Sequence, residues 1–176
     1  MKRVLYILGL LQDKDIDWLA ASGRREPVAP GTDIVVEGSP LDSLFIIIDG
    51  KFAIKKGETV VASVGSGEVV GEISMLDSRP PVATVSASED GNVLRLTHGS
   101  LHAKLDIDPG FASRFYKALA IFLAQRMRER DALGFGDTRD LDEDVFASDE
   151  IDPDQLENLA LAGARFTWLL DRLRSN

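Results

Sequence analysis

The chain has 176 residues, of which 44% are hydrophobic, and its formal net charge is −9 at pH 7. This length suits one domain with a hydrophobic core plus an appendage. The chain contains no cysteine, which excludes disulfides, thiolate metal sites and a cysteine nucleophile, and which fits a cytoplasmic protein.

The acidic residues are concentrated in one segment. Residues 137–154 hold nine acids and one base, whereas residues 1–136 hold eighteen acids and sixteen bases. No basic stripe for phosphate contacts is present, so we do not expect nucleic acid as a partner. No apolar run approaches the roughly 18 residues of a membrane span, and Val4 to Leu11 lacks the small-residue cleavage site of a signal peptide. We therefore expect neither a membrane segment nor secretion.

Helical periodicity first appears in Asp13 to Ser22, where Asp13 can cap the helix and Gly23 can end it. From Arg24 to Thr97 the sequence changes to short β-branched runs separated by turn residues. Their spacing predicts about eight strands in a barrel or jelly roll. The predicted fold is therefore mainly β, with flanking helices.

Two Asp-Gly dipeptides, Asp49-Gly50 and Asp90-Gly91, carry the strongest short-range hairpin signal. They predict two antiparallel pairs of strands. One joins Leu44 to Ile48 with Phe52 to Lys56, and the other joins Val82 to Ala87 with Val93 to Thr97.

Helical periodicity returns after the strands. Ser100 to Leu105 predicts a short helix that Asp106 to Pro109 ends, and Gly110 to Leu133 predicts one long helix. The long helix has an apolar surface wide enough to cover the barrel and leave a stripe for a second partner. Its candidate docking residues are Phe111, Phe115, Leu119 and Phe122.

Residues 134–152 predict an acidic linker, and a final amphipathic helix begins at Pro153. Its apolar residues are spaced three and four apart, and they include Leu156, Leu159, Phe166 and Leu170. Because this stripe is too short for a coiled coil alone, we expect it to dock against the long helix, in the same subunit or in a homodimer. The expected units are residues 1–133, 134–152 and 153–176.

The run from Gly65 to Val85 has the composition of an anion-binding cradle. Its glycines let backbone N–H groups approach a ligand, and Glu72 to Leu76 can form a short helical turn with a positive N-terminal end. Each feature also has a purely structural interpretation. The glycines can serve backbone turns alone, and Glu72 can simply cap its turn.

This run resembles the phosphate-binding cassette of the cyclic nucleotide-binding domain family, which includes bacterial catabolite-activator-like regulators. Supporting matches are Pro30-Gly31 and Leu44 to Gly50. The resemblance implies that Gly71 and the backbone N–H groups of Ile73 and Ser74 face a cyclic phosphate, and that Glu72 accepts a hydrogen bond from the ribose hydroxyl. It also implies that Ala83 and Thr84 lie beside phosphate and base. The implied ligand is cyclic AMP or cyclic GMP, with no further cofactor.

The sequence departs from the family pattern at Pro81, which occupies the position of the phosphate-binding arginine. Loss of a bidentate, charge-assisted contact of about 1.5 to 3 kcal/mol weakens binding roughly tenfold to a hundredfold. Arg79 is the nearest substitute. However, Pro80-Pro81 favours a polyproline II path, on which positions 79 and 81 point in different directions.

No pattern in the chain predicts catalysis. His98 and His102 are spaced like metal ligands on a helix, but a third ligand at a fixed offset is missing, and no nucleophile elbow or Walker A sequence is present. We therefore expect a non-enzymatic regulatory module with a protein partner or a second copy. A ligand-free scaffold with the same fold is the alternative. A DNA-binding regulator is disfavoured because the long helix is not followed by a basic recognition helix.

Overall fold

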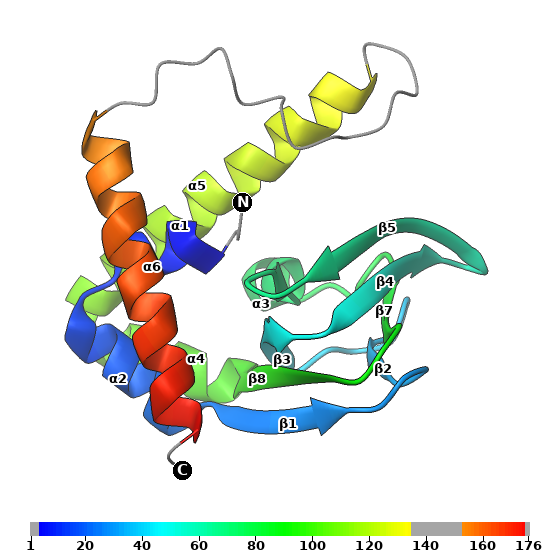
Figure 1. Cartoon of the computed structure of the whole chain (residues 1–176), viewed down its shortest axis with the longest axis horizontal. Helices are drawn as coiled ribbons and strands as arrows, with labels where there is room; N and C mark the ends of the chain where they lie inside the picture. The colour runs from blue at the N-terminus through cyan, green and yellow to red at the C-terminus, as the bar shows by residue number, and fades with distance from the viewer. Residues whose placement is uncertain (1–3, 135–152, 175–176) are drawn as a thin grey trace.

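The computed structural model describes residues 4–134 and 153–174, including the side chains of residues 7–128 and 161–173. The described helices are α1 (Val4–Leu10), α2 (Asp13–Ser22), α3 (Glu72–Asp77), α4 (His98–Ile107), α5 (Pro109–Gly134) and α6 (Pro153–Arg174). The described strands are β1 (Arg24–Val28), β2 (Asp33–Val35), β3 (Ser43–Asp49), β4 (Lys51–Lys56), β5 (Thr59–Gly65), β6 (Val69–Val70), β7 (Thr84–Ala87) and β8 (Gly91–Thr97). Figure 1 shows that α1, α2, α5 and α6 gather at one side of the strands.

The strands form two four-stranded sheets with the orders β1-β8-β3-β6 and β2-β7-β4-β5. All pairings are antiparallel. The mainly β prediction, with eight strands in a jelly roll and flanking helices, is therefore confirmed.

Both predicted Asp-Gly hairpins are wrong. β3 pairs with β6 and β8, and β4 pairs with β5 and β7, so the chain changes sheets at Gly50. It changes sheets again between β7 and β8. Gly50 has a φ of +88°, and a Cβ there would lie 2.6 Å from the Cα of Gly91. The two Asp-Gly dipeptides are thus adjacent corners between the sheets, where only glycine allows the backbones to approach so closely.

Strand β3 is buried on both faces, which explains why its sequence is a continuous apolar run instead of an alternating one. Leu44, Ile46 and Ile48 pack into the core that the helices share with this sheet. Phe45 and Ile47 pack into the second core, between the two sheets. β3 therefore joins the helical layer to the jelly roll.

Helix α2 has the predicted bounds, but its N-terminal cap differs from the prediction. Gln12, not Asp13, stands at the cap position, and its backbone N–H donates to Asp15 Oδ2 at 2.8 Å. The buried carboxylate of Asp15 also accepts two hydrogen bonds from Arg114 of α5, at 2.7 and 2.9 Å. This bidentate pair fastens α5 to the start of α2.

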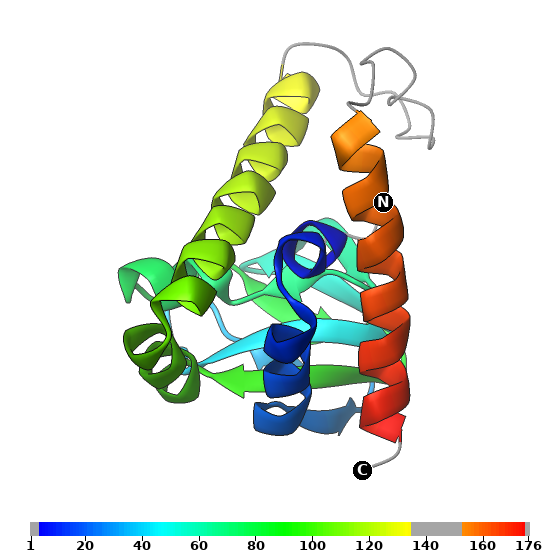
Figure 2. The same ribbon diagram turned by 90° about the vertical axis from the view of Figure 1, so that its left-hand side faces the viewer.

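Helix α6 docks on α1 and α2 instead of on the long helix, with α1 lying between α5 and α6 (Figure 2). Phe166 is buried in this contact and Leu170 is half-buried, whereas the side chains of Leu156 and Leu159 lie outside the described residues. The predicted linker at 134–152 is also outside the described residues, apart from Gly134 at the end of α5.

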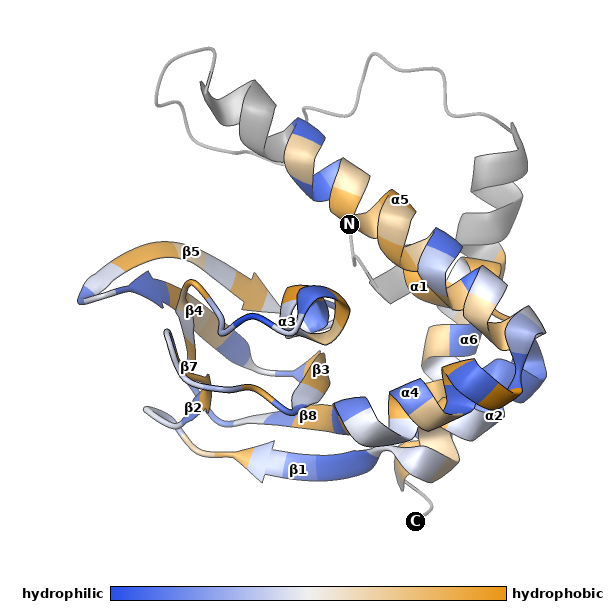
Figure 3. Ribbon diagram, turned by 180° about the vertical axis from the view of Figure 1, so that it is seen from behind, coloured by the Kyte–Doolittle hydropathy of each residue, from blue (hydrophilic) through white to orange (hydrophobic). Residues whose placement is uncertain are grey.

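Helix α5 turns its apolar surface inward. Figure 3 shows hydrophobic residues where α5 passes α1. Phe111, Phe115, Leu119 and Phe122 are each at most 2% exposed, and all four belong to the core shared by the helices and β3. These side chains dock α5 within the chain and do not form a free surface. Among the described residues, no helix has the length and apolar composition required to cross a membrane.

Replacing Arg114 with methionine removes the partner of a buried carboxylate and keeps most of the apolar stem. We expect a loss of about 2 to 4 kcal/mol in the free energy of unfolding, because Asp15 then stays buried without its counter-charge. Urea denaturation measures the loss. Arg172→Met is the matched control, since the Arg172–Asp17 pair is exposed and contributes less than about 1 kcal/mol. Equal effects of the two changes would contradict a special role for the Asp15–Arg114 pair.

Asp108 caps α5, and this cap gives stability a defined pH dependence. Its carboxylate accepts from Lys104 Nζ at 2.8 Å and from the Phe111 N–H at 2.9 Å, which lowers its pKa from 3.8 to about 2. Because the folded pKa lies below the unfolded one, the stabilisation is complete above pH 3.8 and is lost as the pH falls towards 2. We expect Asp108→Asn to lower the melting temperature at pH 7. The difference from the native protein should shrink between pH 4 and pH 2, and a pH-independent difference would exclude this origin.

Candidate functional site

The run from Gly65 to Val85 folds into β6, the short helix α3 and the start of β7. Gly71 begins α3 with a φ of +89°, and its carbonyl accepts from the Met75 N–H at 3.2 Å. A Cβ at position 71 would lie 2.6 Å from the carbonyl oxygen of Ser43. Both the left-handed backbone and this close approach require glycine, whether or not a ligand binds.

Glu72, the first residue of α3, is only 2% exposed. Its carboxylate forms an ion pair and a hydrogen bond with the guanidinium of Arg126, a residue of α5. Ser74 is also buried, whereas the side chain of Ile73 is 50% exposed. The structure thus brings Gly71, Glu72 and Ser74 together and turns the Ile73 side chain to solvent.

Sequence reasoning missed Arg126 as a site residue. It lies in a group of arginines towards the end of the long helix, for which stabilisation of the helix terminus is sufficient explanation. The side chain instead reaches α3, and its guanidinium also lies 5.6 Å from the Phe122 ring centroid. A buried glutamate requires a partner, but the sequence does not show which arginine the packing brings to it.

Between α3 and β7, neither position 79 nor position 81 directs a cationic side chain into the cassette. The side chain of Arg79 is 84% exposed, and its Nε lies 3.8 Å from Asp77 Oδ2. The backbone N–H of Arg79 donates to Asp77 Oδ1 at 3.0 Å. Pro81 is half-buried, and its carbonyl accepts from the Gly38 N–H at 2.8 Å. Arg79 therefore extends along the surface next to its own turn.

Thr84 and Ala83 lie half-buried where the chain enters β7. The Thr84 hydroxyl accepts from the Glu37 N–H at 3.0 Å, and Glu37 Oε2 accepts from the Gly57 N–H at 2.9 Å. These bonds connect the cassette to the loop after β2 and to the β4–β5 turn. The Thr84 hydroxyl retains its proton for donation to another group.

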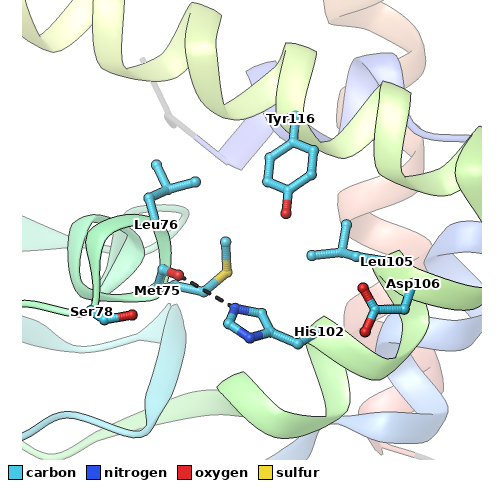
Figure 4. Close-up of a pocket in the computed structure, with 7 residues that line it drawn as sticks. All are labelled: Met75, Leu76, Ser78, His102, Leu105, Asp106 and Tyr116. Carbon is cyan, nitrogen blue, oxygen red and sulfur yellow. Dashed lines mark hydrogen bonds between the residues drawn. The ribbon is translucent and has the colours of Figure 1, made fainter.

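A cavity of about 260 Å³ lies between α3 and the helices α4 and α5 (Figure 4). The Tyr116 hydroxyl points into it, and His102 Nε2 lies 3.4 Å from the Met75 carbonyl oxygen. A second cavity of about 250 Å³ lies beside Arg95 and Phe45. None of the seven predicted ligand residues lines either cavity.

His98 and His102 stack behind α3, with ring centroids 6.4 Å apart. Burial lowers the pKa of His98, and the neighbouring His102 lowers it further. Among the described residues, no three histidine or carboxylate side chains are grouped to hold a metal ion. Of the two histidines, His102 is the one that contacts α3, at the Met75 carbonyl.

Comparisons with known proteins identify the family and the fold. Residues 25–108 match the cyclic nucleotide-binding domain family. An uncharacterized NTE family protein from Mycobacterium tuberculosis is 28% identical over 120 residues, which are 68% of this chain and 21% of that protein. The chain thus spans about a fifth of the length of this relative.

Two solved structures share the fold. A cyclic nucleotide-binding domain from Methylobacillus flagellatus KT has a TM-score of 0.68 at 24% identity, with 80% of this chain and 85% of that chain covered. The N-terminal domain of a transcriptional regulator from Streptomyces coelicolor A3(2) has a TM-score of 0.59 at 31% identity, with 78% and 99% covered. Both structures share the fold of this chain, and residues 25–108 belong to the cyclic nucleotide-binding domain family.

Proposed function

We propose that this chain is a regulatory module whose binding of cyclic AMP or cyclic GMP is weakened or altered. The observation that carries the proposal is the cassette itself, which has Gly71, a buried Glu72, and Pro81 at the position where the family resemblance implies an arginine. The cassette therefore keeps its frame without the usual counter-charge for a phosphate. A bidentate arginine contact is strong and directional, so its loss weakens affinity and relaxes the choice of ligand.

The position of Arg79 supports weakened binding. Its side chain is exposed and paired with Asp77, so recruiting it to a phosphate requires a new path for the chain through Pro80 and Pro81. Proline fixes φ near −65°, which limits such a change. The exposed position of Arg79 therefore supports the proposal that it does not replace the missing arginine.

The Glu72–Arg126 pair gives the module a way to respond. A ribose hydroxyl that donates to Glu72 has to share its carboxylate with Arg126 or displace the arginine. Because Arg126 belongs to α5, a ligand at Glu72 acts directly on the position of that helix. A regulatory domain of this kind shifts between states that differ in the contacts of one helix.

A ligand-free scaffold is the second candidate, and the same ion pair favours it. Arg126 satisfies the buried carboxylate of Glu72 from within the chain, so the cassette needs no ligand for stability. α5 also exposes Tyr116, Ile121 and Met127, which are 46%, 39% and 66% exposed. These apolar side chains provide a surface for association with a second copy or another protein.

Pro81→Arg tests the proposal by restoring the missing cation. We expect this change to increase the affinity for cyclic AMP or cyclic GMP roughly tenfold to a hundredfold, because an arginine–phosphate contact is charge-assisted and bidentate. Isothermal titration calorimetry measures the dissociation constants of the native protein and the variant.

Arg79→Ala is the matched control, because Arg79 is a neighbouring cassette residue whose side chain points to solvent. We expect it to leave the dissociation constant unchanged. A large loss of affinity would show that Arg79 has taken over the phosphate contact. Absence of binding by both the native protein and Pro81→Arg would favour the scaffold.

A further inference from the structure

Helix α6 lies against α1 and α2 (Figure 2). Its docking includes polar contacts as well as apolar packing. Its buried residues join the core that the other helices share with β3. They are Ala162, Phe166, Leu169 and Leu173. Apolar burial of this kind stabilises docking without fixing its position.

Arg165 fixes that position. Its guanidinium donates to Asp13 Oδ1 at 2.9 Å, to the Leu8 carbonyl at 3.1 Å and to the Gly9 carbonyl at 3.2 Å. The two carbonyls belong to the last turn of α1, and Asp13 is the first residue of α2. The Arg165 side chain is only 14% exposed, so its donors to the two carbonyls depend on these acceptors, whereas Asp13 is 81% exposed and meets the guanidinium at the surface.

The same turn also holds α5. Asp15 lies two residues after Asp13 and takes the bidentate contact from Arg114. The first turn of α2 thus carries two aspartates, one bound by α5 and the other by α6. Helix α1, immediately before this turn, contacts both α5 and α6.

Helix α5 is fastened at two points along its length. Arg114 fastens it to α2, and Arg126, about three turns further on, fastens it to Glu72 in the cassette. A change at Glu72 therefore acts on α5, and the other ion pair of α5, Arg114–Asp15, lies beside the contact of α6 with Asp13. The exposed Arg172–Asp17 pair, which also involves α6, contributes little.

We propose that the α1–α2 turn couples α5 to α6, so that α6 undocks when Arg126 releases Glu72. The reason is geometric: Arg165 contacts acceptors from both α1 and α2. A shift of α2 relative to α1 separates Asp13 from the two carbonyls, so Arg165 can no longer contact all three acceptors at once. Docked and undocked α6 are then two discrete states. The version in which a ligand triggers undocking rests on the proposed function. The coupling between α5 and α6 does not.

Hydrogen–deuterium exchange of the full chain tests the coupling. We expect Arg126→Gln to increase exchange of the α6 amides roughly tenfold, although residue 126 is not in α6, because it favours the undocked state. Arg165→Gln should produce the same increase. Arg172→Gln is the control on α6, and it should leave the exchange within about twofold of native.

Glu72→Gln is a second variant, which breaks the Glu72–Arg126 pair from the cassette side. Circular dichroism verifies that each variant is folded. If Arg126→Gln and Glu72→Gln raise exchange in α5 but leave α6 as in the native protein, the coupling is refuted. The double variant Arg126→Gln with Arg165→Gln should exceed neither single variant, because Arg126 acts on α6 through the Arg165 contact, which Arg165→Gln has already removed. Additive effects would show two independent contacts and would also overturn the proposal.

A second experiment measures α6 exchange in Pro81→Arg with and without cyclic AMP or cyclic GMP. Nucleotide binding that raises α6 exchange supports both the inference and the proposed function. Binding without a change in α6 refutes the inference and leaves the proposed function standing. If no nucleotide binds but Arg126→Gln still releases α6, the coupling stands and the proposed function fails.

Discussion

The burial of the Glu72 carboxylate is the constraint on which the arrangement of the cassette and the long helix depends. A charge at 2% exposure is costly to bury, and Arg126 of α5 offsets part of that cost by pairing with it. This contact joins α5 to the cassette. The Asp15–Arg114 pair then fixes the other end of the helix, and the apolar side chains between them fill the core. Two buried carboxylates thus each hold one arginine of α5, on either side of its apolar contacts.

The sequence predicts those features of the fold that depend on short-range chemistry. The bounds of α2 and the extent of the strand-rich region follow from periodicity and turn residues, and the long helix predicted from Gly110 to Leu133 is observed from Pro109 to Gly134. Strand pairing was predicted wrongly because Asp-Gly marks a reversal of the chain but does not specify which strands it joins. At Gly50 and Gly91 the reversal lies between sheets, and the actual partners are distant in sequence.

The candidate site also combines features that the sequence predicts with features that it does not. The requirement for glycine at position 71 is visible in the sequence and in the left-handed backbone of the structure. Arg126 could not be identified, because its contact depends on the angle at which α5 crosses α3. The orientation of Arg79 likewise follows from the local turn with Asp77, which the sequence does not specify. Tertiary packing, not local preference, decides which cation reaches which carboxylate.

The double-sided burial of β3 also matters while the chain is being made. Leu44 to Ile48 is an uncharged, β-prone segment with no internal breaker, and its main partner ends at Thr97. During synthesis this segment emerges long before β8 and the covering helices α5 and α6 exist. Until then it exposes two apolar faces and two unpaired edges, the composition that favours intermolecular β-pairing. The strand that joins the two layers of the folded protein is therefore also its principal aggregation hazard before folding is complete.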